Sequence, residues 1–210
     1  GAGPRDSAAE DELGTGHPIA IEADTFARAF ERALEARGVP FAIVGGEDRD
    51  VSLDGARWIV CATSGRLKPE LFERLEQTAV DGARVTLGPV PPRGVDVARL
   101  ATRKSRVPTT CTDDPASVDA AVALAVDELA LPSYACDPDG VFATVHEDAA
   151  GRPRVLFLLN GGDADCVARV TVRGATRATD ALDGSSYDGR AGLFEVRAPP
   201  RTVRMLALTD

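Results

Sequence analysis

The hydrophobic pattern of this 210-residue chain changes near residues 134–140. Before that point, apolar residues recur at helical spacing in some segments and form short continuous runs in others. After it, apolar and polar residues alternate in one short segment after another. A spacing of three to four residues fills one helix face, whereas a spacing of two fills one strand face. The sequence therefore predicts two architectures joined in one chain.

In the first half, predicted helices alternate with predicted strands. Phe26, Phe30 and Leu34 fall on one face of a helix over residues 25–37, with Asp24 as its N-cap. Further helices are predicted at 69–81 and 115–130, and short apolar strands at 39–44, 58–62 and 85–87. Strands that alternate with helices through short connections are typical of a parallel sheet. We expect an α/β parallel-sheet domain over residues 19–133, after a leader or linker, residues 1–18.

The second half predicts antiparallel strands. The predicted strands are 141–146, 154–159, 166–172, 176–181, 192–196 and 203–208, of which the first two form a hairpin. Glycines follow aspartates at 183–184 and 188–189, where turns between strands need residues that tolerate positive φ. Strands of this length at such intervals are typical of a small antiparallel all-β sandwich or barrel. We expect that domain over residues 134–210.

Composition and charge exclude several classes of function. The formal net charge is −9, which argues against a nucleic-acid binder that tracks phosphates. Apolar runs fall short of the roughly 20 residues that cross a bilayer, and no signal peptide is visible, so we expect a cytoplasmic protein without a membrane partner. One basic cluster stands out as a solvated loop or an anion or partner patch: Arg99, Arg103, Lys104 and Arg106.

No metal or cofactor site is predicted. The four cysteines are widely spaced, and the chain holds only two histidines, which disfavours zinc; the cysteines are Cys61, Cys111, Cys136 and Cys166. Gly45 and Gly46 follow a predicted strand, but acidic residues come next and would repel a nucleotide phosphate. Acidic pairs such as Asp163 with Asp165 lie in predicted turns, where solvated carboxylates are expected.

Two residues carry alternative hypotheses about a site. Cys61 ends a predicted strand, where an amidotransferase-like hydrolase would hold its nucleophile, although the flanking residues do not form the small-residue elbow and a buried core thiol fits better. Tyr187 lies in a predicted turn and is the aromatic candidate for a glycan contact, although aromatic content of 5% is low for a sugar-binding module. No catalytic residue is assigned.

The order of these elements resembles the C-terminal part of β-galactosidase-like glycoside hydrolases. The resemblance rests on the apolar segments at 26–44, 53–60, 67–79 and 82–88 in the first half. In the second half it rests on the hairpin that ends at Leu159-Asn160, on residues 178–184, and on Pro199-Pro200 followed by residues 203–206. In that family a flavodoxin-like trimerisation domain is followed by a small β-sandwich.

The resemblance implies a function that belongs to a larger protein. We expect a non-catalytic accessory or oligomerisation region whose parent carries an upstream catalytic barrel and forms a homo-oligomer. The glutamates of that barrel have no counterpart in this sequence, so catalytic residues cannot be carried over. A hydrolase that uses Cys61 and a free-standing glycan-binding module remain as alternatives.

Overall fold

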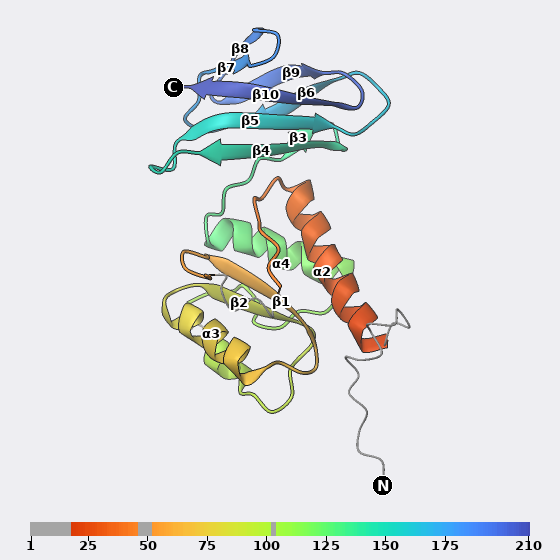
Figure 1. Ribbon diagram of the computed structural model, residues 1–210, viewed down its shortest axis with the longest axis vertical. Coiled ribbons are helices and arrows are strands. Elements are labelled where there is room, and N and C mark those ends of the chain that lie inside the picture. The colour runs from red at the N-terminus through yellow and green to blue at the C-terminus, as the bar shows by residue number, and fades with distance from the viewer. Residues whose placement is uncertain (1–17, 46–51, 102–103) are drawn as a thin grey trace. The chain divides into compact units, whose positions relative to one another are not determined.

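A computed structural model describes residues 18–45, 52–101 and 104–210 (Figure 1). The chain divides into two compact units. The first unit comprises residues 1–33 and 43–131, and the second comprises residues 34–42 and 132–210. The predicted leader lies almost entirely outside the described residues, and the predicted domain boundaries stay a prediction.

The described residues of the first unit form three helices of ordinary length and one short parallel sheet. The helices are α2 (Pro18–Ala36), whose end belongs to the second unit, α3 (Pro69–Val80) and α4 (Pro115–Glu128), with a 3₁₀ turn η1 (Val97–Leu100). Strands β1 (Trp58–Ser64) and β2 (Arg84–Val90) pair in parallel (Figure 1). Asp114 caps α4 as its side chain accepts the N–H of Ser117. Asp24 is no cap; it lies inside α2 and pairs with Arg28 at 2.8 Å.

The predicted flavodoxin-like parallel-sheet domain is wrong. Among the described residues, the parallel sheet has two strands, and the remaining eight strands form antiparallel sheets. The predicted strand at 39–44 is irregular, and Ile43 in it is 74% exposed. Apolar, β-branched residues predict an extended segment equally well whether or not a neighbouring strand pairs with it, because pairing is a non-local property.

Among its described residues, the first unit buries two sets of apolar residues: one cluster joins α3, β2 and η1 through Phe72, Leu87 and Leu100, and two aromatic residues of α2 are buried elsewhere in the unit. The rings of Phe26 and Phe30 lie 4.8 Å apart, and Trp58 of β1 meets Phe30 edge to face at 5.8 Å. The indole N–H of Trp58 donates to Thr86, whose hydroxyl donates to the Pro108 carbonyl, so these two side-chain groups are paired. A Cβ on Gly88 would lie 2.2 Å from a Cys111 carbonyl, so this strand position requires glycine.

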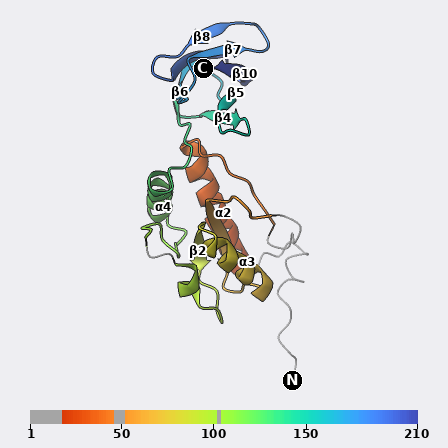
Figure 2. The same ribbon diagram turned by 90° about the vertical axis from the view of Figure 1, so that its left-hand side faces the viewer.

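The second unit consists of two antiparallel sheets (Figure 2). The five-stranded sheet has the order β4-β5-β10-β7-β8, with bounds Val141–Glu147, Pro153–Asn160, Thr202–Thr209, Arg177–Asp180 and Ser186–Asp188. The three-stranded sheet has the order β3-β6-β9, with bounds Cys136–Asp137, Cys166–Thr171 and Leu193–Ala198. The prediction of antiparallel strands in this half is confirmed.

One hydrophobic core joins the two sheets of the second unit. Leu156 and Leu206 of the five-stranded sheet share it with Phe194 and Val196 of the three-stranded sheet, and all four are fully buried. Alternation places every second residue of each strand in this core, as in a β-sandwich. The second half is therefore sandwich-like, and the outward side of each sheet forms a separate surface.

Two buried polar side chains hold the turns of this sandwich. The Asn160 amide donates to the carbonyls of Ala164, Ala198 and Pro199 at 2.9–3.1 Å, and its oxygen accepts the N–H of Gly162. The Asp180 carboxylate pairs with Arg204 at 2.9 Å and accepts the N–H of Leu182 at 2.7 Å. Each side chain thus connects strand β5 or β7 to segments distant in the chain, and each satisfies backbone groups that would otherwise lack partners.

Candidate docking surface

On the outward side of the five-stranded sheet, no charged residue lies where β4, β5 and β10 pair in regular register, up to the β-bulge between His146 and Glu147. We name this area the uncharged face, and it comprises the outward residues of β4, β5 and β10: Phe142, Thr144, His146, Val155, Phe157, Leu159, Val203, Met205 and Ala207. The solvent side of an antiparallel sheet is usually polar. This side is mostly apolar, so the strands carry apolar residues on both faces.

Strand register gathers the largest of these side chains into rows. Phe142, Leu159 and Val203 lie opposite one another across the three strands and are 43%, 43% and 50% exposed. In the next row, Phe157 lies between Thr144 and Met205. Since directly opposite residues have Cβ atoms about 5 Å apart, the first row forms a continuous apolar strip, and Phe157 and Met205 widen it in the second row.

The outward side of the three-stranded sheet, in contrast, carries charged residues that form ion pairs. We name it the ion-paired face. Arg169 of β6 pairs with Glu195 of β9 at 2.9 Å and with Asp137 of β3 at 3.4 Å. Arg197 of β9 pairs with Asp165 at 2.5 Å. Such exposed pairs contribute little to stability but keep a surface soluble and hydrated.

The contrast between the two faces of one sandwich indicates where a partner would bind. Depletion of charge at the centre of a patch is what distinguishes protein interfaces from the remaining surface. Contiguous exposed apolar patches in a monomer mark interaction sites or ligand grooves. The uncharged face is therefore the candidate docking surface, and the ion-paired face is the side expected to meet solvent.

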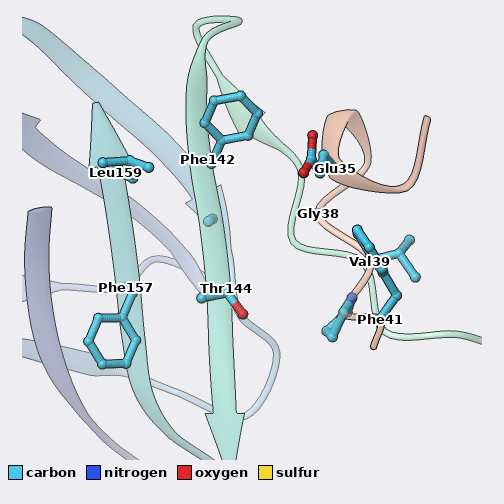
Figure 3. Close-up of a pocket in the computed structure, with 10 residues that line it drawn as sticks. Glu35, Gly38, Val39, Phe41, Phe142, Thr144, Phe157 and Leu159 are labelled. Carbon is cyan, nitrogen blue, oxygen red and sulfur yellow. The ribbon is translucent and has the colours of Figure 1, made fainter. Parts of the chain in front are cut away.

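A groove crosses this face at the β4 side of the second unit (Figure 3). We name it the β4 groove; its volume is about 450 Å³, and it is lined by Glu35, Gly38, Val39, Pro40, Phe41, Phe142, Ala143, Thr144, Phe157 and Leu159. In Figure 3, Glu35, Val39 and Phe41 come from the segment before the sheet, while Phe142 and Thr144 come from β4. Glu35 is the single charged residue of this lining.

The segment that borders the β4 groove is tied to the sandwich by its backbone. The Tyr134 N–H donates to the Gly38 carbonyl at 2.9 Å, and the Ser133 hydroxyl donates to the Arg37 carbonyl at 2.6 Å. Gly38 has a φ of 58°, and a Cβ there would lie 2.3 Å from the Tyr134 carbonyl carbon. Only glycine therefore fits where the end of α2 meets the sandwich segment.

The sequence missed this surface, although a signal was present. Pattern reasoning assigned the apolar residues of each strand to a buried face and took the alternate residues to be polar. In β5 the alternate residues are Val155, Phe157 and Leu159, and in β10 they include Val203 and Met205. Apolar residues on both faces of neighbouring strands predict either complete burial or a docking surface.

Neither Tyr187 nor Cys61, the two candidate residues named from sequence, lines the β4 groove. Tyr187 is half-buried on β8 and packs against the sandwich core, and it stays a predicted glycan contact. His146 is exposed on β4, with its ring 5.2 Å from that of Phe157. Cys61 lies on β1 in the first unit, whose described residues contain no histidine to act as a base.

Burial makes Cys61 a poor nucleophile. Desolvation raises the pKa of its thiol to about 11. A thiolate is the reactive species, so this thiol is almost fully protonated at neutral pH. We expect iodoacetamide at about pH 7 to label Cys61 far more slowly than free cysteine, whose pKa is about 8.5. Mass spectrometry of the labelled peptide checks this, and rapid selective labelling of Cys61 would revive the nucleophile hypothesis.

The basic cluster is largely neutralised where the structure describes it. Arg99 pairs with Glu76 at 2.5 Å, and Arg106 pairs with Glu128 at 2.5 Å. The side chain and backbone of Arg106, with the Ser105 hydroxyl, donate to Glu128 and hold the pKa of its carboxyl at about 2. Lys104 is exposed, and Arg103 lies outside the described residues. The cluster therefore offers less positive charge to a partner than the sequence implied.

Searches for metal sites and membrane helices found neither in the part of the chain that the structure describes. No cluster of three or more His, Cys, Asp or Glu side chains there has metal-binding geometry. Within the same residues, no helix has the length and hydropathy needed to span a membrane. The predicted cytoplasmic location stays a prediction.

Solved structures with a similar fold are glycoside hydrolases. The exo-carrageenase GH42 of Bacteroides ovatus superposes on 87% of this chain with a TM-score of 0.54 and 14% identity, and this chain covers 26% of that structure. A putative alpha-galactosidase/melibiase of Bacteroides fragilis matches 46% of this chain with a TM-score of 0.29 and 13% identity, and 22% of its own chain is covered. AmyP in complex with maltose matches 92% of this chain with a TM-score of 0.29 and 14% identity, and 36% of its own chain is covered.

The carrageenase similarity shows a shared fold alone, and the other two are too weak to carry a conclusion. This chain spans about a quarter of the length of the carrageenase. No protein-family model matches the sequence, and no curated protein matches it either. The chain thus shares its fold with part of one solved glycoside hydrolase, the carrageenase.

Proposed function

We propose that this chain is a non-catalytic accessory region of a carbohydrate-active, β-galactosidase-like glycoside hydrolase. Its uncharged face docks against the catalytic part of that larger protein. The observation that carries the proposal is the contrast between the uncharged face and the ion-paired face of one sandwich. The fold shared with a quarter of a glycoside hydrolase supports the same reading, as an analogy of fold.

The described acidic residues support a non-catalytic role. A glycosidase needs two carboxylates that face each other across the scissile bond. The acidic pair named from sequence is engaged in ion pairs, Asp163 with Arg201 and Asp165 with Arg197, and Asp148 likewise pairs with Arg152 and Arg154. None of these three lines the β4 groove. The upstream catalytic barrel and the homo-oligomer expected from the resemblance are part of the proposal.

A charge placed on the uncharged face is expected to break docking. Val203 on the uncharged face and Val167 on the ion-paired face are 50% and 52% exposed, so they form a matched pair. In the isolated chain, both Val203→Lys and Val167→Lys should change the free energy of unfolding by about 0.5 kcal/mol or less. In the full native protein, Val203→Lys should lower glycosidase activity and the thermal midpoint, because the lysine becomes buried without a partner.

Val167→Lys is the control and should leave the native protein unchanged. Both variants and the wild type are compared by differential scanning calorimetry and by hydrolysis of aryl galactosides. Equal behaviour of the two lysine variants in the native protein would contradict docking through the uncharged face. Hydrolysis by the isolated wild-type chain would contradict its non-catalytic role.

A further inference from the structure

We propose that the β4 groove binds an extended peptide segment that pairs with the free edge of strand β4. The segment has alternating apolar residues and carries a lysine or arginine that meets Glu35. This inference rests on the proposed docking surface and names the form in which the partner protein binds at one end of it. The free edge of β4 provides backbone groups for pairing, the β4 groove provides access to them, and Glu35 provides a charge that a basic residue complements.

Strand β4 is the one unprotected edge among the described strands of the sandwich. The four edge strands are β4, β8, β3 and β9. Strands β8 and β3 have three and two residues, and β9 carries Glu195 and Arg197 outward. Strand β4 has seven residues, and none before Glu147 is charged or proline. Proteins protect sheet edges with short strands, charges or prolines, because free N–H and C=O groups pair with any extended chain.

The β4 groove gives a peptide access to that edge. Three consecutive residues of β4 line it, Phe142, Ala143 and Thr144, so the strand backbone borders the groove together with the side chains of its outer face. In the described residues, no backbone hydrogen bond joins β4 to residues 39–42 on the other side of the groove. Three strand residues span about 10 Å, enough to pair with about three residues of a bound segment.

The lining specifies what such a segment must carry. Phe41, Phe142 and Phe157 offer apolar contacts to every second side chain of an added strand (Figure 3). Glu35 is exposed and is the sole charged residue of the lining, so a basic residue on the peptide complements it. An acidic segment would be repelled, both here and by a chain with a net charge of −9.

The test uses fluorescein-labelled, end-blocked peptides and fluorescence anisotropy with the full 210-residue chain. The first peptide, Lys-Val-Thr-Val-Thr-Val-Thr, has the alternation and the basic residue. The second has glutamate in place of lysine, and the third has proline in place of the central valine. We expect the first to bind, the second to bind about two- to fivefold more weakly, and the third not to bind, because proline removes a ladder N–H and fits poorly in a strand.

Variants of the chain assign the binding to the groove. Thr144→Lys places a positive charge beside β4 in the groove and should weaken binding of the first peptide at least tenfold. The larger side chain would clash with the bound peptide, and its charge would repel the lysine of the peptide. Thr171→Lys on β6, also an exposed threonine but on the ion-paired face, is the matched control and should not change the affinity. Glu35→Gln should remove the difference between the first and second peptides.

Several results would overturn this inference. They are no binding of the first peptide, equal binding of the proline peptide, or equal binding by Thr144→Lys and Thr171→Lys. The proposed function is tested independently of the peptide site by Val203→Lys, because Val203 does not line the groove. Val203→Lys should keep peptide affinity while it impairs the native protein, so loss of one property without the other shows which proposal is wrong.

Discussion

Replacement of Asp180 by alanine should lower the free energy of unfolding of the second unit by about 3–5 kcal/mol. The side chain of Asp180 is 0% exposed, and that of its partner Arg204 is 16% exposed. The same carboxylate accepts the backbone N–H of Leu182 at 2.7 Å. Its removal leaves a mostly buried guanidinium with the more exposed Asp183 as its remaining acidic partner, and leaves a backbone donor without its acceptor.

The control for Asp180→Ala is the same substitution at an exposed ion pair. Asp188 pairs with Arg177 at 3.0 Å, and the two side chains are 77% and 57% exposed. Asp188→Ala should cost about 1 kcal/mol or less, because exposed pairs are screened by water. Amide hydrogen exchange of strand β10 reports on the second unit by itself, which matters because two units need not unfold as one. Equal effects of the two substitutions would contradict the role assigned to Asp180.

Replacement of Asn160 by alanine is the second change expected to have a large effect. Asn160 is 3% exposed, and its amide group serves three carbonyls and one backbone N–H around the turn after β5. Loss of these bonds should lower the free energy of unfolding by about 2–4 kcal/mol, since each hydrogen bond contributes about 1 kcal/mol and buried orphan groups cost more. Hydrogen exchange of β5 and β10 amides measures the change.

Asn160→Asp separates the hydrogen-bond pattern from side-chain size. A carboxylate of the same shape would face the Ala198 and Ala164 carbonyls, so its folded-state pKa should rise above the usual value of about 3.9. The loss in free energy of unfolding caused by Asn160→Asp should therefore be greatest above that raised pKa. It should decrease as the pH falls toward about 4, because the carboxyl then becomes protonated in the folded state. A variant as stable as the wild type at neutral pH would show that the donors of Asn160 contribute nothing.

Elements whose sequence signals lie within a few residues of one another could be predicted from the sequence. The helix with Phe26 and Phe30 on one face, the helix that follows Asp114 and the antiparallel strands of the second half all appear in the structure. Each follows from residue spacing or from a capping side chain within a few residues.

Features that depend on distant partners were missed. The segment 39–44 has the composition of a strand but finds no strand to pair with, and Asp24 lies inside a longer helix that begins at Pro18. The uncharged face emerges only when register places Phe142, Leu159 and Val203 in one row, since each alone looks like an ordinary exposed apolar residue. Sequence spacing cannot supply that register between strands.

The central claim is that these residues form an accessory region of a larger glycosidase, and the mass of the native polypeptide tests it most directly. An antibody raised against the 22.0 kDa chain should detect, in an immunoblot of the source organism, a band several times larger than the chain itself. A single band at the mass of the chain would contradict the claim and would leave a free-standing protein whose uncharged face needs another partner.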